Sequence, residues 1–82
     1  MTTLINTSEN LGKAIRSARR ALGLTQPQLA MAAGFGVRFI VELEVGKPTV
    51  LLENILRVLQ ALGGTLMVEG LDDAGAANGD QP

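Results

Sequence analysis

Apolar residues recur along the chain with the spacing of an α-helix, and glycine or proline interrupts the pattern between successive segments. The first segment predicts a helix from Ser8, a favourable N-cap, to Leu22. Gly23 then ends it, because glycine readily takes the left-handed conformation common at helix C-termini. Its bases lie mostly on the side opposite the apolar arc: Lys13, Arg16 and Arg20. Arg19 instead borders the apolar arc, which sets it apart from the other bases.

The segment Thr25-Gln26-Pro27-Gln28 predicts the start of a second helix. Thr25 as N-cap and Gln28 three residues later form the pattern of a capping box. Pro27 falls in the first turn, where its missing N–H costs little. Gly34 then predicts a turn, so this helix is short.

Residues 36–45 predict a third helix, which Gly46-Lys47-Pro48 closes with a C-terminal glycine and a proline stop. A helical wheel directs three of its side chains to the core: Phe39, Ile40 and Leu43. The opposite side carries valines at i, i+4 and i+8 beside two charged residues: Val37, Val41, Val45, Arg38 and Glu42. This valine stripe is expected to face solvent in an isolated domain.

The last helix is predicted to begin within residues 49–52 and to end at Leu62. Its apolar residues cover an arc of about 160°, wider than one core face needs, which indicates a second packing partner such as another subunit. After Gly63-Gly64, residues 65–69 predict one short strand, and a single strand needs a partner. Pairing with its own copy across a two-fold axis is the most economical solution. The predicted dimer contacts are Leu59, Leu62, Thr65, Leu66, Met67 and Val68.

The chain is therefore divided into an N-terminal arm (1–7), one mainly α domain (8–70) and an acidic tail (71–82) expected to be disordered. Trp and Tyr are absent, so the core must be aliphatic. Cysteine and histidine are absent too, which excludes disulfides, thiolate metal sites and imidazole catalysis. The sequence shows no signal peptide and no apolar run long enough to span a membrane, so we expect a soluble, cytoplasmic protein.

Charge is unevenly distributed along the chain. Residues 1–70 carry a net charge of +2 and the tail carries −3, giving −1 overall. This balance is compatible with a nucleic-acid partner but does not require one. The sequence offers no nucleophile–base pair, phosphate-binding glycine loop, metal cluster or cofactor motif. The adjacent carboxylates of Asp72 and Asp73 lie on the tail without the preorganisation that catalysis needs, so an enzyme is not expected.

The pattern LGKAIRSARRALGLTQPQLAMAAGF, followed by FI, ELE and GKP, resembles the Cro/repressor-like helix-turn-helix family. With the wide last helix and the segment GGTLMV, it is most similar to the HipB-type antitoxins, over about residues 10–68. This resemblance implies a lambda-repressor-like bundle of four or five helices and a cytoplasmic homodimer. It also implies a repressor of its own operon that binds a HipA-type kinase toxin.

The resemblance further implies roles for individual residues. Gln26 and Lys47 would contact DNA phosphates, with Arg16 and Arg20 as outlying charge, because helix N-termini and polar side chains suit anionic oxygens. Simple capping by Gln26 and Gln28 and a solvated basic face are the alternatives. The full set predicted to contact DNA is Gln26, Gln28, Gly36, Val37, Arg38, Val41, Glu42 and Lys47. Arg19 and Glu44 would instead form a structural ion pair that joins the first and third helices.

The reading face departs from the family, because valine replaces residues that are usually polar or basic. In the interpretation we favour, valine methyls contact thymine methyls, Arg38 reads guanine and Glu42 accepts from cytosine. Alternatively, the stripe binds a protein, since contiguous exposed apolar patches usually mark interfaces. A third interpretation is that Arg38 and Glu42 only pair with each other.

These patterns predict a sequence-specific DNA-binding repressor, the HipB-type antitoxin of a toxin–antitoxin operon. A homodimer would place two third helices roughly 34 Å apart, so its operator would be palindromic double-stranded DNA. The competing hypothesis is an adaptor whose apolar helix-turn-helix face binds a protein rather than DNA.

Overall fold

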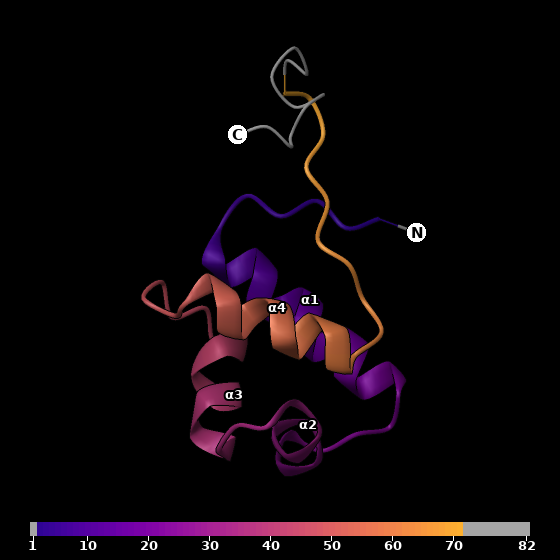
Figure 1. Cartoon of the computed structure of the whole chain (residues 1–82), viewed down its shortest axis with the longest axis vertical. Coiled ribbons are helices and arrows are strands. Elements are labelled where there is room, and N and C mark those ends of the chain that lie inside the picture. Colours follow the sequence, from indigo (N-terminus) through magenta and orange to yellow (C-terminus); the bar gives the residue numbers. More distant parts are fainter. Residues whose placement is uncertain (1, 72–82) are drawn as a thin grey trace.

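The computed structural model describes residues 2–71, and within them the chain forms four α-helices and no strand. The helices are α1 (Ser8–Ala21), α2 (Gln26–Ala33), α3 (Val37–Glu44) and α4 (Leu52–Ala61). Helices α2 and α3 lie at one end of the molecule, and α1 and α4 lie above them (Figure 1). The predicted mainly α, four-helix architecture is therefore confirmed.

One aliphatic core holds the four helices together. Every helix contributes at least one fully buried aliphatic side chain to it, which matches the absence of Trp and Tyr from the sequence. Close packing of this kind fixes the helices relative to one another, because the interior has little free volume. The buried core residues are Ile15, Leu29, Ala30, Ala33, Ile40, Leu43, Ile55 and Val58.

Two glycines let α1 lie directly against the end of α3. A Cβ atom on Gly12 would stand 2.5 Å from the carbonyl oxygen of Glu44 and 2.6 Å from that of Leu43. Gly46 has φ 92°, and a Cβ there would stand 2.9 Å from the Cα of Glu9. Both contacts are with backbone atoms that a side chain cannot push aside. The close approach of the two backbones therefore fixes the position of the C-terminal end of α3 against α1.

Local capping signals set the helix starts, with one correction. The predicted capping box of α2 is confirmed: Thr25 Oγ1 accepts from the backbone N–H of Gln28 at 3.2 Å, and Gln28 Oε1 accepts from that of Thr25 at 2.8 Å. The prediction of Ser8 as the N-cap of α1 was wrong. Thr7 is the cap, because its backbone is extended and its Oγ1 accepts from the N–H of Asn10 at 3.0 Å.

The predicted strand over residues 65–69 was also wrong for the single chain. After α4, this segment runs away from the helices without strand hydrogen bonds (Figure 1). The physical reason is that a strand needs a partner for its N–H and C=O groups, and residues 2–71 supply no other strand. Leu66, Met67 and Val68 are consequently exposed. The expectation of a disordered tail falls almost wholly on residues 72–82, outside the described chain.

Candidate nucleic-acid interface

The turn between α2 and α3 directs the third helix. Gly34 has φ 84°, a conformation that glycine adopts without steric cost, and its N–H donates to the carbonyl of Ala30 at 2.9 Å. The N–H of Phe35 donates to the same carbonyl at 2.8 Å. This closed turn ends α2 within one residue and starts α3 in a new direction. Gly36 is the N-cap of α3 and provides no side-chain hydrogen bond.

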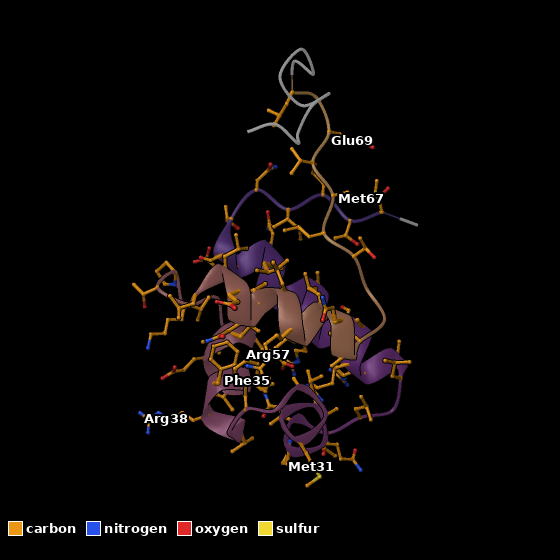
Figure 2. The ribbon with its side chains drawn as sticks, in the orientation of Figure 1. Met31, Phe35, Arg38, Arg57, Met67 and Glu69 are labelled. Atoms are coloured by element: carbon orange, nitrogen blue, oxygen red, sulfur yellow. The ribbon has the colours of Figure 1, made fainter. Side chains whose placement is uncertain are left out.

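The outer face of α3 is exposed and largely apolar. Val37 and Val41 are 43% and 39% exposed, and Val45 lies at the C-cap, also exposed. The Arg38 side chain is 90% exposed and extends away from the body of the protein (Figure 2). The face therefore combines methyl groups with one extended guanidinium group.

Glu42 links the charges of this face. Lys47 Nζ lies 3.2 Å from Glu42 Oε1, and Arg38 Nε lies 3.4 Å from Glu42 Oε2. The hydrogen bond from Lys47 is the main reason that the pKa of the Glu42 carboxyl is lowered, and Arg38 adds to it against the opposing effect of burial. Because the Arg38 contact is long and exposed, it holds that side chain only weakly.

Arg19 and Glu44 form a buried, two-point ion pair. Arg19 Nε lies 2.6 Å from Glu44 Oε2, and its Nη2 donates to Glu44 Oε1 at 3.1 Å. Arg19 Nη1 also donates to the carbonyl of Leu24 at 2.8 Å. The hydrogen bond to Glu44 is the largest cause of the raised pKa of Arg19. The pair thus ties α1, the following loop and α3 into one unit.

Gln26 joins the same network. Its Nε2 donates to Glu44 Oε1 at 3.1 Å, a contact that the sequence did not predict. An amide nitrogen carries two hydrogens, so one N–H of Gln26 stays available for another acceptor. Gln28 is engaged in the capping box of α2. The structure thus gives the two glutamines different roles.

A shallow groove of about 600 Å³ lies between the end of α1 and the start of α2. It brings Gln26 together with the bases that the sequence placed at the edge of the interface. Lys47 lies apart from it, beside Glu42 at the end of α3. The groove is lined by Arg16, Arg19, Arg20, Gly23, Leu24, Thr25, Gln26 and Pro27.

Arg57 is a residue of this region that the sequence analysis missed. The other residues on its side of the helical wheel are polar, which gave no sign that it contacts another element. In the structure its guanidinium group reaches the α2–α3 turn (Figure 2). Proximity of this kind depends on the fold, so no local sequence signal could have found it.

Residues 2–71 hold no group of three or more acidic, cysteine or histidine residues arranged to bind a metal ion. None of their helices has the length and apolar character needed to cross a membrane.

Comparison with known proteins agrees with this geometry. A family model described as Helix-turn-helix (HTH_3) matches residues 15–67. An uncharacterized HTH-type transcriptional regulator, y4mF, from Sinorhizobium fredii is 46% identical over 63 residues, which cover 77% of this chain and 83% of the relative. A chain in the solved structure of a HipA-HipB-O2-O3 complex superposes with a TM-score of 0.78 at 22% identity, covering 87% of this chain and all of that one.

Proposed function

The chain belongs to the HTH_3 helix-turn-helix family, and from this membership we propose that it is a sequence-specific DNA-binding repressor. Its family and its regulator relative support a DNA-binding regulator rather than an enzyme. The observation that carries the proposal is the outer face of α3, which follows the α2–α3 turn and is free of other elements. An exposed helix of this kind fits the major groove.

In the proposed complex, base contacts come from three residues of α3. Arg38 donates through its guanidinium fork to O6 and N7 of a guanine, the geometry that arginine matches best. Val37 and Val41 pack against the C5-methyl groups of thymines. Glu42 remains paired with Lys47. When the Arg38 side chain turns toward the base, it leaves its weak contact with Glu42, so that carboxylate offsets little of its positive charge. The operator is accordingly expected to contain both guanine and thymine in each half-site.

Phosphate contacts are proposed at the two ends of this face. At one end lies the N-terminus of α2, where Pro27 has no N–H, Thr25 caps the N–H of Gln28, and the backbone N–H of Gln26 is left to attract an anionic oxygen. The free side-chain N–H of Gln26 adds a donor there, and Arg16 and Arg20 contribute charge along the groove. At the other end, the ammonium group of Lys47 has three N–H donors, so it can bind phosphate while it stays paired with Glu42. These contacts fix the position of α3 without selecting a sequence.

The active species is proposed to be a homodimer. Exposed apolar surface lies at the start of α4, at the N-cap Leu51 and at Leu52, and along the extended segment around Leu66 and Val68. A copy of this segment across a two-fold axis would supply the hydrogen-bond partners that the single chain lacks. Two α3 helices about one duplex turn, roughly 34 Å, apart would then read a palindrome.

We also propose that the protein is the antitoxin of an operon that encodes a HipA-type kinase. The support is a shared fold with a chain of a HipA-HipB-O2-O3 complex. Sequencing of the operon checks this part separately. A neighbourhood without a kinase gene would remove the antitoxin role and leave the repressor in place.

One observation favours a different function. The exposed valines of α3 and the 83% exposed Met31 of α2 give this end of the molecule an apolar surface. Such surfaces commonly bind proteins. An adaptor that uses this face for a protein partner is the alternative to a DNA reader.

The deciding experiment is fluorescence anisotropy of the purified protein with its own upstream DNA, a scrambled duplex and a series of salt concentrations. Selective binding that Arg38→Ala weakens by about 1–3 kcal/mol is expected if α3 reads the groove. Replacing operator thymines by deoxyuridine removes only methyl groups and should weaken binding about three- to fourfold per contacted methyl. Equal affinity for operator and scramble at every salt concentration would contradict the DNA-reading role and favour the adaptor.

A further inference from the structure

The start of α3 has no side-chain cap. The turn consists of Gly34, Phe35 and Gly36, and glycines leave the backbone with more freedom than any other residue. Gly36 also lacks the side-chain oxygen with which Ser, Thr, Asp or Asn usually binds the first free N–H groups of a helix. The orientation of the DNA-reading helix therefore depends on contacts from elsewhere in the fold.

Arg57 of α4 supplies such contacts to both sides of the turn. Its Nη2 donates to the carbonyl of Ala33 at 3.1 Å, one of the carbonyls that the end of α2 leaves without a helical partner. Its guanidinium carbon lies 4.5 Å from the centre of the Phe35 ring, within the range of a cation–π contact. The two labelled side chains lie against each other in Figure 2.

The contact continues into α3 itself. The rings of Phe35 and Phe39 lie with their centres 4.5 Å apart at 33°. A Cβ atom on Gly34 would stand 2.6 Å from Arg57 Nη2, so the glycine leaves room for the guanidinium group. An unbroken series of contacts thus runs from α4 through the turn to the first turn of α3.

We propose that Arg57 is a positioning residue that braces the turn before α3, where the N-cap provides no side-chain hydrogen bond, and so fixes the angle at which α3 meets DNA. It does so from α4, the helix whose outer side we propose as part of the dimer interface. The position of the reading helix is thereby coupled to the helix that carries the subunit contact. The DNA part of this inference rests on the proposed function, whereas the effect on the turn does not.

Four variants separate this role from simpler ones. Arg57→Ala removes the contacts, and Arg57→Lys keeps the charge but loses the planar fork that bonds Ala33 while stacking on Phe35. Lys13→Ala is the matched control, because it removes an exposed positive charge from α1 far along the chain from the turn. Gly36→Ser restores an N-cap, and a Cβ at this position meets no atom within 4 Å.

The first measurement is amide hydrogen exchange by NMR on the full chain. The reporters are Gly34, Phe35 and Phe39, whose N–H groups are hydrogen-bonded within the turn, and the reference is the amide of Ile15 in α1. Arg57→Ala and Arg57→Lys should each speed exchange at the reporters by about tenfold relative to Ile15. Without the Arg57 contacts, the turn can open locally while the rest of the domain stays folded. Gly36→Ser should slow it more in the Arg57→Ala background than in the unchanged chain. An equal increase at Ile15 would overturn the proposal by showing a general loss of stability.

The second measurement is operator affinity of the same variants. Both Arg57 variants should bind several-fold more weakly than the unchanged chain, and Lys13→Ala should differ from it less than either. If Arg57→Lys binds as well as the unchanged chain, Arg57 acts only through its charge and the positioning role is overturned. If the unchanged chain shows no operator preference while the turn still loosens in Arg57→Ala, the repressor function has failed and the turn clamp stands.

Discussion

At the scale of single residues, the buried ion pair of Arg19 and Glu44 governs the fold around the interface. The carboxylate of Glu44 accepts two hydrogen bonds from Arg19 and one from Gln26. Removing Arg19 would therefore leave a buried carboxylate without its opposite charge. Arg19→Ala is expected to lower the free energy of unfolding by about 3–5 kcal/mol, measured by urea denaturation. Arg16→Ala, on the exposed side of the same helix, should change it by less than about 0.5 kcal/mol. Similar losses from the two variants would show that the pair adds little.

Glu42 provides a pH-dependent test of the charges on the reading face. Because Lys47 and Arg38 lower its pKa in the folded state, its contribution to stability is present at neutral pH and is lost as the pH falls through that lowered value. Lys47→Ala should return the pKa of Glu42 toward its ordinary value, and Arg38→Ala should raise it less. A titration of the Glu42 carboxyl by NMR checks this. A pKa unchanged by Lys47→Ala would mean that the pair does not persist in solution.

The exposure of the outer face of α3 was predictable from the sequence, whereas some of the contacts around it were not. Polarity and helical phase placed Arg38, Val37 and Val41 on one face, and the structure leaves all three exposed. The bond between Gln26 and Glu44 was not predicted, because the position of Gln26 at the start of a helix suggested capping or a phosphate contact instead. Arg57 was missed because its contacts with the α2–α3 turn depend on the tertiary fold.

At the scale of helices, the close contact of α1 with the end of α3 requires a residue without a Cβ atom at Gly12. Alanine is favoured over glycine in a helix by about 1 kcal/mol, so propensity alone predicts that Gly12→Ala stabilises. The contacts with the carbonyls of Leu43 and Glu44 predict the opposite, a net loss of about 1–3 kcal/mol from overpacking. Thermal or urea denaturation decides the sign. Ser17→Ala, on the exposed side of α1, is the control and should not destabilise.

The helices were predictable because their signals are local. A capping box, an N-terminal proline and C-terminal glycines act within a few residues of the ends that they define. The shift of the α1 cap from Ser8 to Thr7 shows the limit of this reasoning, since two adjacent hydroxyl residues satisfy the same rule. The strand prediction was wrong for a different reason. Residues 65–69 have the alternating pattern of a strand, but residues 2–71 contain no other strand with which they could pair.

At the scale of the whole molecule, the exposed apolar segment after α4 is the surface through which we propose that the chain dimerises. Leu66 and Val68 alternate along it and lie outside the core cluster. The double variant Leu66→Asp with Val68→Asp should therefore shift the protein from dimer to monomer in sedimentation equilibrium without changing its helical circular dichroism. Operator affinity should fall by at least about tenfold, because the second half-site is no longer bound by a linked subunit. A monomeric unchanged chain at micromolar concentration would contradict the dimer.

The separation between supporting and reading residues has an evolutionary consequence. The Arg19–Glu44 pair, Gly12 and the core all lie behind α3, whereas positions 37, 38 and 41 project from it into solvent. Substitutions at such exposed positions change folding free energy little, usually within about 0.5 kcal/mol. Under the proposed DNA-reading role, relatives that diverge after gene duplication would acquire new operators through these three codons, while the scaffold that presents them is inherited unchanged.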